Sequence, residues 1–184
     1  MRAGPGEALR AAGVVLALFA AAATAEPPDI ESFWEYANPA ANKQRFRAAL
    51  AGASGDGRLE LLTQIARTHS PRRRFAEAHA LLDAVERRLG SAGPAPRTRH
   101  LIERGRTFNS AGDKASARPL FIAAFDTALA TGLDGLAVDA AYMLPIVDGG
   151  AEGARWTERG LALARQSSDP KSHALLPALL NNRP

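Results

Sequence analysis

The chain of 184 residues contains no cysteine, few aromatic residues and only three lysines. Without cysteine, a disulfide framework, a thiolate nucleophile and a cysteine-ligated metal site are all excluded. Aromatic residues make up 6% of the chain and runs of β-branched residues are absent, whereas alanine and leucine dominate. This composition favours helices packed through small residues over a β-sheet. The length suits one domain.

The positive charge is almost entirely arginine, and it is mixed with negative charge along the chain. The formal net charge is +4, and Glu77, Asp83, Glu86 and Glu103 are interleaved with the arginines. A nucleic-acid interface usually gathers its positive charge into a stripe, with aromatic side chains where single-stranded bases stack. The charge alone does not identify a partner; we expect no nucleic-acid partner if the chain is exported.

The first 25 residues have the pattern of a secretory signal peptide. Arg2 and Arg10 precede an uncharged run over 11–22, and Ala23-Thr24-Ala25 supplies the small residues of a cleavage site. The uncharged run is shorter than the roughly 20 residues of a transmembrane helix, and no cysteine follows it for a lipid anchor. We predict a signal peptide over 1–25, a mature chain from Glu26 and export to the periplasm or medium. A leader created by a wrong start codon is the alternative, with a cytoplasmic protein.

Three segments between Arg58 and Arg165 repeat one pattern of residue sizes. A small residue in a first helix is followed twelve positions later by a small residue in a second helix, then by further matching positions four and seven residues on. The periods are 39 (105−66) and 36 (141−105), which is typical of stacked helical hairpins. The matched columns are Ala66, Gly105 and Ala141; Ala78, Ala117 and Gly153; Leu82, Phe121 and Thr157; and Val85, Ala124 and Gly160.

Local residues predict where the helices begin and end. Asn38-Pro39 and Asp113 are candidate starts, and Gly90 and Gly132 candidate exits. Gly93, Pro94 and Pro96 predict a loop between repeats, and Pro145 predicts an early end to its helix. Two capping helices, over 30–37 and 39–52, fall in the N-terminal part 26–57, and the repeats occupy 58–184. The expected fold class is all-α, a right-handed helical-hairpin solenoid of about three repeats.

The chain resembles uncharacterised bacterial tetratricopeptide repeat (TPR) proteins over residues 33–182. The resemblance depends on five stretches: LLTQIARTH (61–69), FAEAHALLDAVE (75–86), ERGRTFNSAGD (103–113), AVDAAYML (137–144) and LLNN (179–182). It implies a helical-repeat fold and partner binding, and no reaction or cofactor. In such proteins the Asn-Asn pair opens the first helix of another repeat, so the end at Pro184 suggests a truncated or frame-shifted product. An uncapped last repeat would offer a surface for self-association.

No catalytic, cofactor or metal motif is found. The histidines His69, His79, His100 and His173 lack metal-ligand spacing, and His69 falls on a packing column. The glycine-rich stretch 52–57 follows a helix and lacks a P-loop lysine, so it is interpreted as a connector. The basic stretch 70–74 is interpreted as a solvated turn, and Trp34 and Trp156 as packing anchors. We expect a protein that is not an enzyme and needs no cofactor.

The candidate binding site is the concave face, which the first helix of each repeat would line. The position after each small residue gives Arg67, Arg106 and Tyr142, and neighbouring positions give Thr63, Arg99, Asn109 and Asp139. The two column arginines could hold an acidic or carboxylate-ended peptide through charge-assisted bonds. The alternative is that the arginines pair with Glu60, Glu103 or Asp139. The leading hypothesis is a protein-interaction module; the alternative is a non-catalytic scaffold domain of a larger regulatory or nucleic-acid-associated assembly.

Overall fold

The computed structural model describes residues 29–35 and 39–182, so the predicted signal peptide and the predicted Asn38 cap lie outside the described residues. Within these ranges every regular element is a helix and no strand occurs, which confirms the all-α prediction. None of the described helices combines the length and the apolar character that crossing a membrane requires.

The elements follow one another with short connections. A 3-10 turn, η1 (Glu31–Phe33), precedes α2 (Pro39–Leu50), and the central helices alternate with two further 3-10 turns, η2 (Ser70–Arg72) and η3 (Leu89–Ser91). The remaining helices are α3 (Gly55–Arg67), α4 (Phe75–Glu86), α5 (Pro94–Ala111), α6 (Lys114–Ala130), α7 (Asp134–Asp148), α8 (Gly150–Gln166), α9 (Pro170–Ala174) and α10 (Leu176–Asn181).

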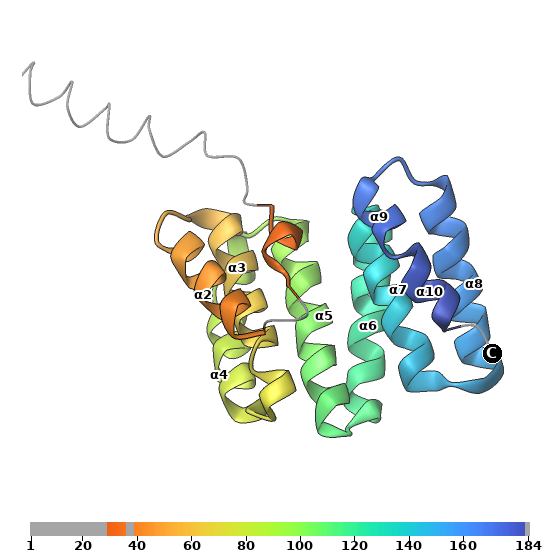
Figure 1. Cartoon of the computed structure of the whole chain (residues 1–184), viewed down its shortest axis with the longest axis horizontal. Coiled ribbons are helices and arrows are strands. Elements are labelled where there is room, and N and C mark those ends of the chain that lie inside the picture. The colour runs from red at the N-terminus through yellow and green to blue at the C-terminus, as the bar shows by residue number, and fades with distance from the viewer. Residues whose placement is uncertain (1–28, 36–38, 183–184) are drawn as a thin grey trace, which may run out of the picture.

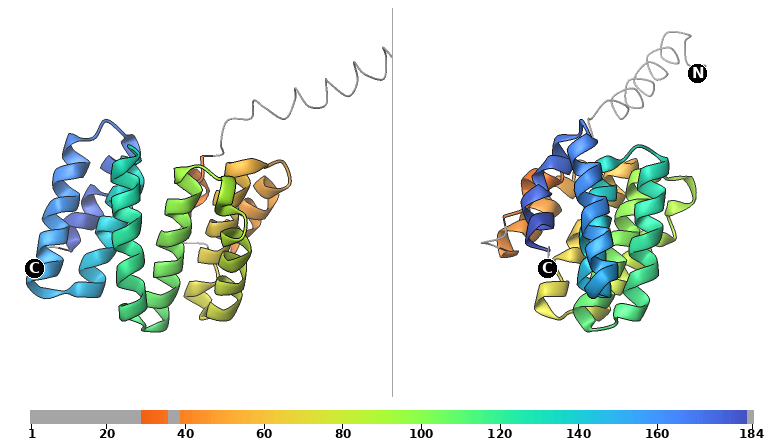
Figure 2. Two further views of the ribbon diagram at one scale, coloured as in Figure 1. Left: turned by 180° about the vertical axis from the view of Figure 1, so that it is seen from behind. Right: turned by 90° about the vertical axis from the view of Figure 1, so that its right-hand side faces the viewer.

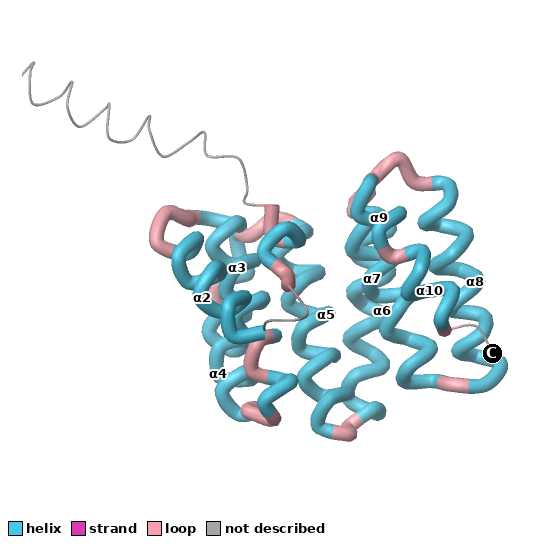
Figure 3. Tube along the Cα trace, viewed as in Figure 1, coloured by secondary structure: helices cyan, strands magenta, loops and turns pink. Residues whose placement is uncertain are grey.

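Three helical pairs form the body of the molecule. Helix α3 packs on α4, α5 on α6 and α7 on α8, while α5 also contacts both α3 and α7. Figure 1 shows the pairs following one another in chain order, and the tube in Figure 3 shows how short the loops between them are. The side view in Figure 2 places η1 and α10 on the same side of the molecule. Short loops make consecutive helices antiparallel neighbours.

The twelve residues of the four repeat columns are all buried. The alanines of these columns and Leu82, Val85 and Phe121 have no exposed surface, and Thr157 is 1% exposed. Gly105, Gly153 and Gly160 are buried as well. The periodic pattern of residue sizes in the sequence therefore correctly identified the helix faces that pack, because these faces lie against a close neighbour and the size of their residues is restricted.

Two column glycines are required by close packing. A Cβ at Gly105 of α5 would lie 2.7 Å from the Phe121 ring of α6, and one at Gly160 of α8 would lie 2.9 Å from Leu179 of α10. A side chain at either position would have to displace its neighbour. The repeat pattern thus reflects contacts within a pair (α5 with α6) and between elements further along the chain (α8 with α10).

Several predicted boundaries are wrong. Pro94 and Pro96 do not form a loop: they lie in the first turn of α5, where a proline costs no hydrogen bond because the first N–H groups have no helical acceptor. Pro145 does not end its helix, since α7 continues to Asp148. The predicted helix over 30–37 is only the turn η1 in its described part. Helix α3 begins at Gly55, shortly before the predicted start of the repeats at Arg58.

Helix ends were predicted correctly where a side chain or a positive φ defines them. The Asp113 carboxylate accepts a hydrogen bond from the N–H of Ser116 at 3.0 Å, at the start of α6. Gly132 follows α6 with a φ of +69°, which glycine adopts without strain. Gly90, by contrast, lies in η3 and is not the exit of α4, which ends at Glu86.

Candidate binding face

The face formed by α3, α5 and α7 holds two neighbouring groups of ion pairs, one around Arg99 and one around Arg106. We call the two groups together the arginine network and define it as three arginines with three carboxylates: Arg67, Arg99 and Arg106 with Glu60, Glu103 and Asp139. These side chains lie on the first helix of each pair, that is, on α3, α5 and α7. They can meet because α5 contacts both α3 and α7. Four of the seven residues predicted for the concave face, Arg67, Arg99, Arg106 and Asp139, therefore meet in one place.

Arg106 lies at the centre of the network. Its Nη1 donates to Glu103 Oε1 at 2.6 Å, and its Nη2 pairs with Asp139 of α7. Burial opposes the charge of the guanidinium, but Asp139 and Glu103 outweigh this effect and raise the pKa of Arg106 above its ordinary value. A buried pair of this kind ties α5 to α7, and loss of one partner would leave an uncompensated charge.

Arg99 connects α5 to α3 and to the N-terminal segment. Its Nε donates to Glu60 at 2.7 Å, and its Nη2 donates to Glu31 of η1 at 2.9 Å. The side chain is 8% exposed. Burial opposes the charged form, yet Glu31 and Glu60 raise the pKa of Arg99.

Arg67 has the weakest ionic contact of the three arginines. Its Nη1 lies 3.8 Å from Glu103 Oε1, and its guanidinium stacks over the Trp34 ring at 4.3 Å from the centroid. The side chain is 21% exposed, so Arg67 lies at the accessible margin of the network. All three arginines thus pair with Glu60, Glu103 or Asp139, the alternative that the sequence left open.

The other three predicted face residues have different surroundings. Thr63 is fully buried, and its hydroxyl donates to the carbonyl of Glu60 at 2.7 Å. Tyr142 is half-buried and packs against two core clusters. Asn109 is half-buried near the end of α5. None of these three side chains takes part in the ion pairs of the arginine network.

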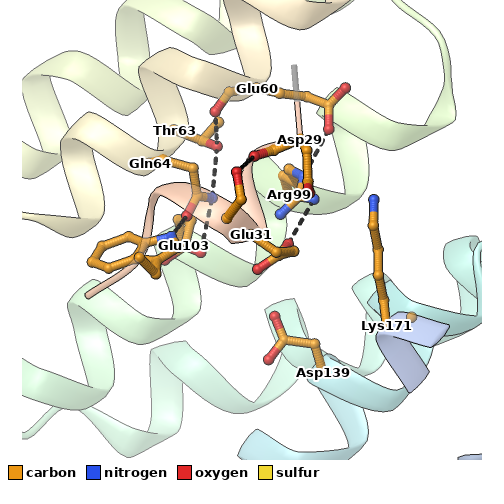
Figure 4. Close-up of polar contacts among 12 residues, drawn as sticks. Asp29, Glu31, Glu60, Thr63, Gln64, Arg99, Glu103, Asp139 and Lys171 are labelled. Carbon is orange, nitrogen blue, oxygen red and sulfur yellow. Dashed lines mark hydrogen bonds and ion pairs between the residues drawn. The ribbon is translucent and has the colours of Figure 1, made fainter. Parts of the chain in front are cut away.

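The segment 29–35 lies on this network, and the sequence did not predict that. Trp34 donates from its indole N–H to Gln64 Oε1 at 3.0 Å, and Gln64 Nε2 donates to Glu103 Oε1 at 3.2 Å. Figure 4 shows the segment lying across the end of the network, with Glu31 directed at Arg99. In the same view Lys171 of α9 extends toward this end of the network.

A polar column in the repeats would have pointed to Gln64 and Glu103. Gln64, Glu103 and Asp139 each stand two positions before a small column residue, at the same spacings of 39 (103−64) and 36 (139−103). Glu60 and Arg99 are also 39 residues apart and pair directly. Equivalent positions of adjacent repeats face one another, so the repeat period predicts these contacts. No comparable signal identifies Glu31 or Trp34, which precede the repeats.

A pocket lies between α4, α5 and α6. This pocket has a volume of about 530 Å³, and Leu101, Phe108 and Leu120 contribute to its lining together with His100 and Arg104. Arg104 donates toward His100 Nε2 at 3.3 Å and pairs with Glu86 at 3.2 Å. Among the residues that the structure describes, no group of three or more His, Asp or Glu side chains is placed to hold a metal ion.

The chain matches no family model, no curated protein and no solved structure. The functional argument therefore depends on the geometry of the chain itself.

Proposed function

We propose that this chain is a non-catalytic protein-interaction module whose helical pairs form a right-handed, TPR-like solenoid. The α3–α5–α7 face is its concave surface and binds an extended segment of a partner protein. The regular columns support this proposal, because stacked hairpins present the first helix of every pair to one shared surface. Such a surface suits an extended ligand, which can contact several pairs at once.

The observation that carries the proposal is the position of the segment 29–35. This short stretch contains one 3-10 turn and otherwise lacks regular structure, yet it lies on the arginine network. It contacts α3 through Gln64 and α5 through Arg99. The chain thus supplies an example of the kind of ligand that we propose: a short acidic and aromatic segment that spans two helical pairs.

The pairing of the arginines restricts how an acidic partner can bind. Glu60, Glu103 and Asp139 already balance the three arginines of the network, so a partner does not meet free cations. It binds at groups that point away from these acids, namely Arg99 Nη2, which contacts Glu31, and the guanidinium face of Arg67, which contacts Trp34. Charge-assisted and cation–π contacts of this kind contribute about 0.5–2 kcal/mol each.

A peptide-display selection on the full chain tests the proposed function. Selected peptides should lose affinity about tenfold when Arg67 is replaced by alanine, because one contact of about 1.4 kcal/mol is then removed. Arg73, which is exposed in the turn before α4, supplies the matched control, and Arg73→Ala should leave affinity unchanged. Selected peptides that respond equally to both substitutions, or to neither, would contradict the assignment of this face.

A further inference from the structure

The segment 29–35 presents two sets of side chains with different roles. Ile30 is 3% exposed and belongs to the core cluster of α2 and α3, with Phe33 packed against it. Phe33 meets the Phe46 ring of α2 edge-on, with centroids 5.6 Å apart. These apolar contacts hold the segment against the first two helices.

Glu31 and Trp34 form the second set, which contacts the arginine network, and Trp34 also packs on the Phe46 ring with centroids 5.2 Å apart. Glu31 remains 45% exposed while its carboxylate binds Arg99. Arg99 already has Glu60 at 2.7 Å, so Glu31 adds a fourth carboxylate to a network with three arginines. Trp34 uses its N–H on Gln64 and its ring on Arg67. Apart from Glu31, the arginines that the segment contacts have their ionic partners on α3 and α5: Glu60 for Arg99 and Glu103 for Arg67.

We propose, building on the proposed function, that the partner presents the same two groups, a carboxylate and an indole ring three residues later, and that the segment 29–35 competes with it as an internal ligand. The carboxylate binds Arg99 Nη2, and the indole ring stacks on Arg67 and donates to Gln64. The partner is therefore a protein segment with a Glu-x-x-Trp pattern. A partner binds only molecules in which the internal segment has left the face. The apparent affinity for the partner is therefore reduced in proportion to the fraction of such molecules.

Trans-binding of a synthetic copy of the segment tests this inference. The probe is a fluorescein-labelled peptide with the sequence of residues 29–35, DIESFWE. The matched control peptide carries the changes Glu31→Gln and Trp34→Ala. Fluorescence anisotropy is measured with the unmodified full chain, with the Glu31→Gln/Trp34→Ala chain and with the Glu31→Gln chain. The single variant changes only a half-exposed side chain, so it keeps the fold if the double variant does not, as circular dichroism reports.

The peptide should bind the double-variant chain at least about tenfold more tightly than the unmodified chain, because the internal competitor is weakened. The single variant should show a smaller gain in the same direction. The control peptide should bind each chain at least about tenfold more weakly than the probe, and adding Arg67→Ala to the double-variant chain should reduce probe binding by about tenfold. Equal probe binding to the unmodified and variant chains, or equal binding of the two peptides, would overturn the inference.

The selected display peptides separate this inference from the function on which it depends. If their binding requires Arg67 but is the same for the unmodified and the Glu31→Gln/Trp34→Ala chains, the internal-ligand inference fails and the interaction function stands. If no selected peptide requires Arg67, the interaction function itself fails at this face.

Discussion

Gly105 of α5 lies directly against the ring of Phe121 of α6. A Cβ on Gly105 would be 2.7 Å from Phe121 Cε1, closer than carbon atoms approach without strain. Both residues belong to the repeat columns, so this contact connects the sequence period to the closest packing between the two helices of a pair.

We expect Gly105→Ala to destabilise the fold despite the better helix propensity of alanine. Overpacking costs about 1–3 kcal/mol, which exceeds the gain of up to about 1 kcal/mol from replacing a helical glycine. Gly90→Ala is the control, because a Cβ there would meet nothing within 4 Å. Urea unfolding measures both variants. A more stable Gly105→Ala chain would mean that α5 and α6 are further apart than described.

Ala117 tests the same packing from the second helix. It has no exposed surface, so Ala117→Leu should lower the free energy of unfolding by about 1–3 kcal/mol. Ala115 lies in the same helix and is exposed, and Ala115→Leu should be nearly neutral. Thermal unfolding of the pair checks the register, and equal effects would argue against it.

Arg106→Ala should be much more destabilising than Arg67→Ala, although the two arginines occupy equivalent repeat positions. Removal of Arg106 leaves Glu103 buried and Asp139 without its guanidinium, and the loss of one partner of a buried pair costs about 3–5 kcal/mol. Removal of Arg67 leaves Glu103 paired with Arg106. Denaturant unfolding of both variants, with exposed Arg155→Ala as a control, measures the difference. Equal losses would show that the two positions are equivalent in energy as well as in sequence.

The buried His100 should make the fold sensitive to acid. Burial, and next the charge of Arg104, hold the pKa of His100 below its ordinary value, so the unfolded chain binds a proton more readily than the folded chain. Stability from this group is complete above the unfolded pKa of about 6.5 and is lost as the pH falls through it. Burial is also the largest cause that lowers the pKa values of His69 and His79, so these two histidines affect stability in the same direction.

Unfolding free energies at about pH 7.5 and pH 5.5 check this expectation. The unmodified chain should be less stable at the lower pH, and His100→Gln should lose less between the two conditions. His173 is exposed, so His173→Gln should lose as much as the unmodified chain. The same pH response in all three chains would show that His100 does not contribute.

Processing of the leader gives a prediction that is independent of the fold. If 1–25 is a signal peptide, intact mass and N-terminal sequencing of the exported protein should give Glu26 as the first residue. A substitution of Ala25 by a large residue should block cleavage. Soluble protein that keeps Met1 in the cytoplasm would contradict the predicted export.

The sequence by itself determined the helical class, the three helical pairs and the faces on which they pack. These features depend on residue size at fixed spacing, and a helix places residues four and seven apart on one side whatever lies around it. The cap at Asp113 was predictable for the same reason, since its donor at Ser116 is three residues away.

Only the tertiary structure decided what the arginines do and where the N-terminal segment lies. Arg67 and Arg106 look equivalent along the chain, but Asp139 is within reach of Arg106 alone because α7 packs beside α5. The contact of Glu31 with Arg99 spans 68 residues, and no period relates the two positions. Ion pairs form between side chains that packing brings together, so the network and its contact with the segment 29–35 required the arrangement of the helices in space.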